Sequence, residues 1–178
     1  MNVYNEDDYK SQDGILTSVW GPSLWHFLHS MSFNYPDNPT KEDKENYKSF
    51  IQSLKNILPC KYCRINIINN FKELPLTNKD MKNRYTFSLY VYNLHELINK
   101  MLNKKSNLCY EEVRERYEHF RSRCKDEYKK IVKKEKGCTE SLYGEKSKCI
   151  IKIVPHNKRC KTFQMNKLCK KKRYTRKN

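Results

Sequence analysis

The sequence lacks alanine entirely, and it lacks any apolar run long enough to cross a bilayer. Lys, Asn, Ile and Tyr are abundant instead, which is the composition expected from an AT-rich gene. Residues 1–13 are polar and acidic, whereas a signal peptide needs a basic start followed by an apolar stretch. We therefore expect no transmembrane segment and no signal peptide, and we expect residues 1–13 to form a disordered leader.

Acidic residues are scarce in the C-terminal part of the chain, which carries most of the formal net charge of +17. Residues 125–178 hold 19 Lys and Arg against 5 Asp and Glu. Such a basic tail is typical of contact with nucleic acid, acidic substrates or a membrane surface, and equally of a solvated segment. Because an AT-rich gene is itself rich in lysine codons, the charge does not choose among these alternatives.

Apolar residues recur at helical spacing between residues 14 and 124 and predict an all-α domain. Thr40 and Asp43 suit the first turn of one of its helices as a capping pair. In the tail, residues 125–136 predict a basic helical extension, and the β-branched run at 149–154 predicts one strand of a small hairpin. The five expected helices cover about residues 21–34, 41–57, 60–74 and 79–102, and a shorter stretch that begins at residue 110.

Eight cysteines in a chain without an export signal are more typical of a metal binder or a redox catalyst than of a disulfide scaffold. Cys60 and Cys63 form a CxxC pair at the start of an expected helix, where the helix dipole stabilises the thiolate of the first cysteine. Half of a zinc site is the alternative, but no second CxxC and no His-x-x-x-His pair completes it. A zinc- or nucleic-acid-binding module that uses the CxxC and the basic tail is thus the alternative function.

Four motifs occur together in the chain, in a fixed order. They are Trp20-Gly21-Pro22-x-x-Trp25-x-x-x-His29, Tyr35-Pro36-x-x-Pro39-Thr40, Pro59-Cys60-x-x-Cys63 and His95-x-x-Ile98-Asn99-x-x-Leu102-x-Lys104. Over about residues 14–124 their order and spacing resemble the Erv/ALR family of FAD-linked sulfhydryl oxidases, especially the forms encoded by large DNA viruses. The resemblance implies a four-helix bundle with a short fifth helix, followed by a basic Cys-containing extension at 125–178.

The resemblance also implies that FAD is held non-covalently at one end of the bundle. The spacing of two residue pairs agrees with this, since Trp25 and His29, and likewise His95 and Asn99, are four apart and share a helix face. For each pair, ordinary core packing is the alternative. The flavin-binding residues that the resemblance implies are Gly21, Trp25, His29, Tyr35, His95, Asn99, Lys104 and Tyr117.

The sequence departs from the family pattern at two positions. Glu96 stands where the family motif has its first Asn, and Tyr90 stands where the family often has Trp. Either departure could change a flavin contact. An oxidase core that has lost activity and serves as a scaffold or packaging protein is therefore a third alternative.

The remaining cysteines occupy single, widely spaced positions. By resemblance, Cys109 and Cys124 form a structural disulfide, which would add roughly 3 kcal/mol for a loop of about 15 residues, and two free thiols are the alternative. For the tail we expect two internal disulfides, with a redox shuttle to the CxxC or a four-Cys zinc site as alternatives. The tail cysteines are Cys138, Cys149, Cys160 and Cys169.

The activity implied by the resemblance is the oxidation of protein thiols. A substrate thiol would attack Cys60, and Cys63, the cysteine nearer the flavin in the family, would pass two electrons to FAD. Molecular oxygen would then accept the electrons and form hydrogen peroxide. The resemblance further implies a homodimer packed through the first two helices, acting in the host cytoplasm or the virion.

Overall fold

The chain divides into two compact units, residues 1–107 and 108–178. The computed structural model describes residues 5–123, 138, 140–142, 145–161 and 163–170. No helix within these ranges is long and apolar enough to cross a membrane.

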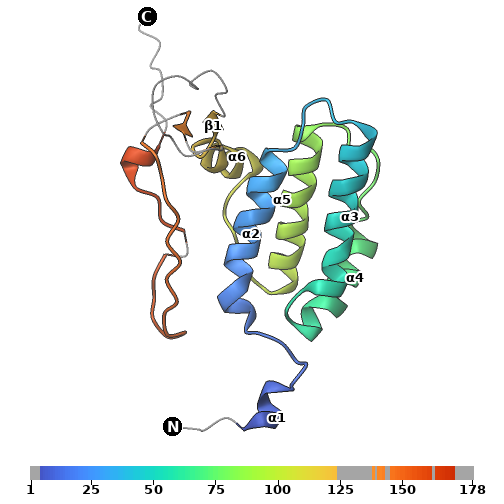
Figure 1. Cartoon of the computed structure of the whole chain (residues 1–178), viewed down its shortest axis with the longest axis vertical. Helices are drawn as coiled ribbons and strands as arrows, with labels where there is room; N and C mark the ends of the chain where they lie inside the picture. The colour runs from blue at the N-terminus through green and yellow to red at the C-terminus, as the bar shows by residue number, and fades with distance from the viewer. Residues whose placement is uncertain (1–4, 124–137, 139, 143–144, 162, 171–178) are drawn as a thin grey trace, which may run out of the picture. The chain divides into compact units, whose positions relative to one another are not determined.

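Four long helices build the first unit as an all-α bundle (Figure 1). Helix α2 packs against α5, and α3 packs against α4, which also contacts α5. The helices of this unit are the short α1 (Glu6–Tyr9), α2 (Thr17–Phe33), α3 (Lys41–Ile57), α4 (Lys61–Glu73) and α5 (Arg84–Met101). The predicted four-helix bundle is confirmed.

Hydrogen bonds near the first turn explain where helices α3 and α2 begin. Helix α3 has the predicted bounds because the Thr40 hydroxyl accepts from the Asp43 amide at 3.0 Å, while the Asp43 carboxylate accepts from the Thr40 amide at 2.8 Å. Helix α2 begins at Thr17, earlier than predicted. The Trp20 indole donates to the Ile15 carbonyl at 2.9 Å and so holds the additional N-terminal turn.

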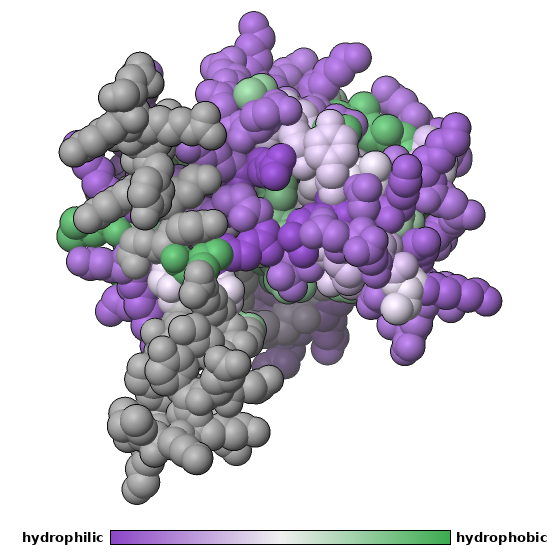
Figure 2. Space-filling view, turned by 90° about the horizontal axis from the view of Figure 1, so that it is seen from above, coloured by the Kyte–Doolittle hydropathy of each residue, from purple (hydrophilic) through white to green (hydrophobic). Residues whose placement is uncertain are grey.

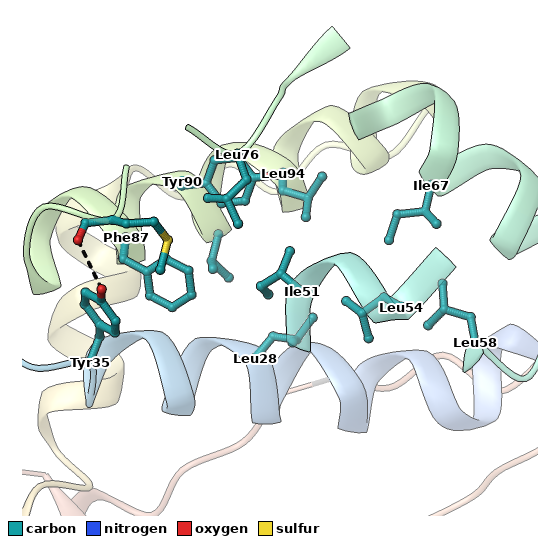
Figure 3. Close-up of a cluster of buried hydrophobic side chains, with 12 residues drawn as sticks. Leu28, Tyr35, Ile51, Leu54, Leu58, Ile67, Leu76, Phe87, Tyr90 and Leu94 are labelled. Atoms are coloured by element: carbon teal, nitrogen blue, oxygen red, sulfur yellow. Dashed lines mark hydrogen bonds between the residues drawn. The ribbon is translucent and has the colours of Figure 1, made fainter. Parts of the chain in front are cut away.

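Apolar side chains of the four helices meet in one core (Figure 3). Tyr35 is fully buried there, and its hydroxyl donates to the Met81 carbonyl at 3.0 Å. Hydrophilic side chains cover most of the described surface in Figure 2, where apolar residues show only in small patches. The core residues are Leu28, Tyr35, Ile51, Leu54, Leu58, Ile67, Leu76, Met81, Phe87, Tyr90, Val91 and Leu94.

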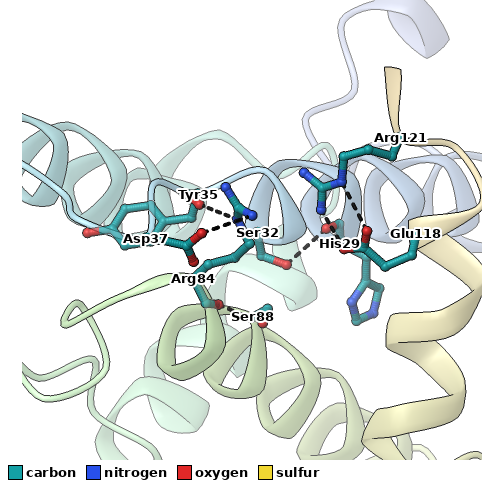
Figure 4. A network of polar contacts seen from close by, with 8 residues as sticks. All are labelled: His29, Ser32, Tyr35, Asp37, Arg84, Ser88, Glu118 and Arg121. Atoms are coloured by element: carbon teal, nitrogen blue, oxygen red, sulfur yellow. Dashed lines mark hydrogen bonds and ion pairs between the residues drawn. The ribbon is translucent and has the colours of Figure 1, made fainter. Parts of the chain in front are cut away.

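A polar network fixes the chain that follows α2 to the first turn of α5 (Figure 4). The Arg84 guanidinium donates to the Tyr35 carbonyl at 2.7 Å and forms an ion pair with Asp37 at 3.3 Å. The Ser88 hydroxyl donates to the Arg84 carbonyl one turn further along α5. These contacts hold the facing surfaces of α2 and α5 in register.

The leader contains local structure over part of its length, which differs from the disorder expected for residues 1–13. Asn5 caps α1, and its side chain and that of Asp8 accept each other's backbone amides. Further along, Asp13 and Ile15 form backbone hydrogen bonds with the segment that precedes α4. Such a pairing between distant segments leaves no pattern in the local sequence.

The second unit contains helix α6 (Tyr110–Glu118), strands β1 (Ser122–Arg123) and β2 (Glu140–Ser141), and a short 3-10 helix, η2 (Lys167–Cys169). The two strands pair antiparallel, Ser122 opposite Ser141. Residues 149–154 form no strand, so the predicted hairpin strand is wrong there: its isoleucines are exposed, with no apolar layer to cover them. The predicted basic helix at 125–136 lies outside the described residues.

The cysteine pairing differs from the expected one. Cys109 is a free, exposed thiol, so the Cys109–Cys124 disulfide is not formed; Cys124 itself lies outside the described residues. Cys138 is disulfide-bonded. The other tail cysteines, Cys149, Cys160 and Cys169, are free, which contradicts two disulfides within the tail. The intervals between cysteines in the sequence do not show which segments lie side by side. In the structure, β1 lies beside β2.

Candidate functional site

Cys60 and Cys63 lie at the N-terminus of α4, as the sequence predicts. Cys60 is the N-cap residue, with extended backbone angles of φ −149° and ψ 123°. Its sulfur accepts a hydrogen bond from the Cys63 amide at 3.2 Å. Both thiols are free and partly exposed, so they can react with a disulfide that approaches from outside.

The two thiols of the pair differ in acidity. Partial burial acts to raise the pKa of Cys60, but hydrogen bonds from the Cys63 thiol and amide and from Thr17 outweigh it and lower that pKa. Burial raises the pKa of Cys63, and its hydrogen bond to Cys60 raises it further. Cys60 is therefore the better thiolate and the better leaving group in thiol–disulfide exchange.

Trp25, His29 and His95 form a second cluster, between α2 and α5. The Trp25 ring stacks on the His95 ring, with centroids 3.8 Å apart and planes 7° apart. His29 Nε2 lies 3.0 Å from His95 Nδ1, so one nitrogen donates and the other accepts. The structure thus joins three sequence-predicted residues from two helices.

Both histidines are uncharged at neutral pH. Burial lowers the pKa of His29 to about 3, and electrostatic repulsion from His95 and His26 lowers it further. Burial also lowers the pKa of His95 to about 4; Glu96 opposes this shift and Lys104 adds to it. Neutral imidazoles can both donate and accept, which suits an uncharged heterocycle or a sugar hydroxyl.

The end of α5 places Asn99 and Lys104 beside this cluster. The Lys104 amide donates to the Asn99 carbonyl at 2.8 Å, and the Asn103 amide donates to the Lys100 carbonyl at 3.1 Å. Asn103 has φ 54°, so the helix ends in a left-handed turn with paired carbonyls. The side-chain amide of Asn99 also donates to the Glu96 carboxylate at 3.1 Å. Glu96, one of the two departures from the family pattern, therefore orients the Asn99 side chain.

A single stripe on α2 links the cysteine pair to the aromatic cluster. Thr17, Gly21, Trp25 and His29 are spaced four apart, so each lies beside the next along one ridge of the helix, over about 18 Å. At one end the Thr17 hydroxyl lies 3.4 Å from the Cys63 sulfur. In the middle, a Cβ atom added to Gly21 would meet only Thr17 at 3.5 Å, so this position leaves room beside the helix. The stripe can accept an elongated, partly aromatic ligand.

Two tyrosines lie in the first unit outside this stripe, and a third lies in the second unit. Tyr35 is a core residue beyond the C-terminus of α2, and burial raises its pKa to about 12. Tyr90, at the position where the family often has Trp, is buried and donates to the Leu74 carbonyl at 3.2 Å. Tyr117 belongs to α6 in the second unit, where burial raises its pKa to about 12.

Sequence reasoning missed the contribution of Thr17. It lies four residues before Gly21, a spacing that could have placed it on the same helix face as Trp25. Its contact with Cys63 spans 46 residues, and no local pattern indicates it. No group of three or more His, Cys, Asp or Glu side chains gathers for a metal ion in the part of the chain that the structure describes.

These features define a helical bundle with a dithiol at one end of an aromatic and polar stripe. A sequence model of the Erv1 / Alr family matches residues 22–118. The chain therefore belongs to the Erv1 / Alr family. The match covers most of the bundle, including the CxxC pair, Trp25 and His29, and begins after Thr17 and Gly21.

Several curated relatives carry oxidase names. A probable FAD-linked sulfhydryl oxidase of Acanthamoeba polyphaga mimivirus is 36% identical over 86 residues, covering 48% of this chain and 60% of the relative. The Arabidopsis thaliana FAD-linked sulfhydryl oxidase ERV1 is 28% identical, covering 53% and 48%. An FAD-linked sulfhydryl oxidase of African swine fever virus is 31% identical, covering 48% and 70%. The chain thus spans about half to two thirds of these relatives.

Solved structures agree with the fold. The yeast Erv1 core matches with a TM-score of 0.52 and 23% identity, covering 66% of this chain and 92% of that one. A cysteine-to-serine mutant of Erv1 from Saccharomyces cerevisiae matches with a TM-score of 0.53 and 23% identity, covering 65% and 73%. At this identity the likeness establishes the helical-bundle fold.

Proposed function

We propose that this chain is an FAD-dependent thiol oxidase that forms disulfides in protein substrates and passes the electrons to molecular oxygen, giving hydrogen peroxide. The observation that carries the proposal is the stripe on α2, which joins Cys63 through Thr17 to the stacked Trp25 and His95. A dithiol on the same stripe as an aromatic surface for a flat ligand is the arrangement that this chemistry needs. The names of the relatives support the same activity.

The residues on the stripe suit FAD in shape and chemistry. The room beside Gly21, next to Thr17 whose hydroxyl contacts the Cys63 sulfur, suits a flat ring system that must lie close to a sulfur. Trp25 and His95 offer aromatic surface for stacking, and the neutral His29 and Asn99 offer hydrogen bonds. Lys104, beyond the end of α5, supplies a cation for the phosphates. FAD, when bound, supplies the two-electron acceptor that reacts with oxygen.

The cysteine pair carries out the exchange steps. A substrate thiolate attacks the Cys60 sulfur of the oxidised pair, the Cys60–Cys63 bond breaks, and Cys63 leaves as a thiolate. A second substrate thiolate then attacks the substrate sulfur of the mixed disulfide, and Cys60 leaves as a thiolate. The low pKa of Cys60 favours this second step, because a more acidic thiol is a better leaving group. The substrate gains one disulfide, and the pair gains two electrons.

Purification followed by two measurements tests the proposal. The full chain should show the visible absorption of bound flavin, and a small dithiol should cause oxygen uptake with formation of peroxide. Cys60→Ser and Cys63→Ser should abolish the uptake, whereas Cys149→Ser, which changes an exposed tail thiol, should keep it. Absence of flavin together with no dithiol-dependent uptake after addition of FAD would reject the proposal.

We also propose a homodimer that packs through α2 and α3. Phe27 on α2 is 52% exposed although it is large and apolar, and it meets Phe50 of α3 edge to face at 6.0 Å. A second copy would cover this pair. Analytical ultracentrifugation should show a dimer that Phe27→Asp weakens, and a monomeric wild-type protein would contradict it.

We further propose where the protein acts and what its basic tail contacts. The viral relatives support action in the host cytoplasm or the virion. Contact between the tail and nucleic acid stays a prediction of the sequence, and a DNA affinity that falls steeply with salt would support it.

A further inference from the structure

The leader segment makes backbone contacts on both sides of Cys60. The Lys61 amide donates to the Asp13 carbonyl at 3.0 Å, and the Ile15 amide donates to the Pro59 carbonyl at 2.6 Å. Gly14, between them, forms an antiparallel bridge with Cys60. The leader thus lies directly against the backbone of the first redox cysteine.

Only glycine can occupy the middle of this contact. Gly14 has φ 112°, a conformation that L side chains rarely adopt. A Cβ atom at this position would lie 2.2 Å from the Pro59 carbonyl oxygen and 2.8 Å from the Cys60 Cα atom, both backbone atoms. Any larger residue must therefore push residues 13–15 away from Cys60.

The segment is also anchored beyond Gly14. The Trp20 indole donates to the Ile15 carbonyl at 2.9 Å, and the Thr17 hydroxyl lies 3.4 Å from the Cys63 sulfur. Residues 13–17, which we call the brace, therefore connect the start of α2 to the backbone at Cys60 and to the Cys63 sulfur.

The brace contacts favour the backbone geometry that Cys60 needs as a helix cap. A capping side chain reaches the first amides of its helix only from an extended backbone, and the bridge with Gly14 holds Cys60 extended. The Asp13 carbonyl takes the first amide of α4, that of Lys61, which leaves the Tyr62 and Cys63 amides for the Cys60 sulfur. The guanidinium of Arg64, in the first turn of α4, donates to the Leu58 carbonyl at 2.5 Å.

We propose that the brace positions Cys60 as the capping sulfur of α4, so that Cys60 rather than Cys63 exchanges with substrate thiols, and that Gly14 is the positioning residue on which the brace depends. This inference rests on the proposed function, because it assigns a role to Cys60 within the same reaction. It gives residues 13–17 a part in selecting the reactive sulfur, although they lie outside the region that the family model matches.

Competitive alkylation of the full-length chain tests the role of the brace. The reduced protein is treated anaerobically with iodoacetamide over a series of pH values, and mass spectrometry gives the rates at Cys60 and Cys63 separately. In the wild type, Cys60 should react faster than Cys63 below neutral pH. Gly14→Ala should reduce the ratio of the two rates by about tenfold, the effect of losing one hydrogen bond to a thiolate.

Two further variants make the result specific. Ile15→Pro removes the amide that donates to Pro59 and keeps Gly14, so it should reduce the rate ratio in the same direction. Gln12→Ala changes an exposed neighbour outside the brace and should keep the wild-type ratio. Circular dichroism shows that the bundle is folded in each variant.

An unchanged rate ratio in folded Gly14→Ala and Ile15→Pro would overturn the inference. Alkylation needs neither flavin nor oxygen, so a protein that binds no flavin and takes up no oxygen after addition of FAD would contradict the proposed function and still give a clear answer about the brace. Conversely, an active oxidase with an unchanged ratio would contradict the brace alone.

Discussion

The indole ring of Trp25 lies parallel to the imidazole of His95, with centroids 3.8 Å apart and an interplanar angle of 7°. The two residues come from α2 and α5, which are far apart in the sequence and packed together in the bundle. Burial keeps the imidazole neutral, so the pair presents an uncharged aromatic surface next to Asn99 and Lys104. The proposed flavin site depends on this contact.

Removal of the Trp25 ring should weaken flavin binding without unfolding the bundle. Trp25→Ala loses an aromatic stacking surface worth about 0.5–1.5 kcal/mol, so the Kd for FAD should rise by up to about tenfold. Trp25→Phe keeps a smaller ring and should fall between the wild type and Trp25→Ala. Fluorescence titration of flavin-stripped protein with FAD gives the three values. Tyr9→Ala, which removes an exposed ring from α1, serves as the control, and an equal loss in that variant would contradict the assignment.

Tyr35 should affect stability rather than flavin binding. Tyr35→Phe removes the hydrogen bond to the Met81 carbonyl and leaves a buried acceptor, so the free energy of unfolding should fall by about 1 kcal/mol. Urea unfolding measures this change, and flavin titration should give the wild-type Kd. A higher Kd for FAD with unchanged stability would contradict this prediction and would show that Tyr35 belongs to the flavin site, as the family resemblance implies.

The two buried histidines should make the protein less stable in mild acid. Their pKa values, about 3 for His29 and about 4 for His95, lie below the ordinary 6.5. As the pH falls below 6.5, the unfolded chain therefore binds protons that the folded chain does not bind. The free energy of unfolding should then decrease by about 1.4 kcal/mol per pH unit for each histidine, until the pH approaches the folded values.

Urea unfolding between about pH 6 and pH 5, where most carboxylates stay ionised, isolates the histidine effect. His29→Gln should remove roughly half of the slope, while His156→Gln, which changes an exposed histidine of the second unit, should leave it unchanged. A slope that His29→Gln does not alter would show that His29 titrates normally in the folded state.

Glu96 should make the bound flavin harder to reduce. Its carboxylate accepts from Asn99 and raises the pKa of His95, so its charge is felt within the proposed site. Glu96→Gln removes that charge and keeps a hydrogen-bond acceptor, and the flavin midpoint potential should become less negative. Potentiometric titration measures the shift, and Glu73→Gln at the far end of α4 is the control. Equal potentials in all three proteins would show that the carboxylate does not act on the flavin.

Local signals in the sequence predicted much of the bundle. The bounds of α3 followed from Thr40 and Asp43, and the CxxC position followed from Pro59, because these residues act on their own neighbours. The faces that carry Trp25 with His29 and His95 with Asn99 followed from helical spacing. Helical spacing did not predict that these two faces contact each other, and only the family resemblance indicated this contact.

The rest depends on contacts between distant segments. The brace at Cys60 and the Thr17–Cys63 contact join residues more than 40 positions apart. The β1–β2 pairing likewise brings together Ser122 and Ser141, which are separated in the sequence. Backbone hydrogen bonds of this kind carry no side-chain signature, and Gly14 was the one residue whose type could have indicated a close approach.

Anaerobic reduction of the purified protein by a small dithiol tests the central claim most directly, because it asks whether electrons pass from the cysteine pair to a flavin held on the α2 stripe. In the wild type, the visible absorption band of the flavin should bleach on addition of the dithiol, and in Cys63→Ser it should persist although the flavin remains bound. Bleaching at the same rate in both proteins would show that the flavin takes electrons without Cys63 and would contradict the account.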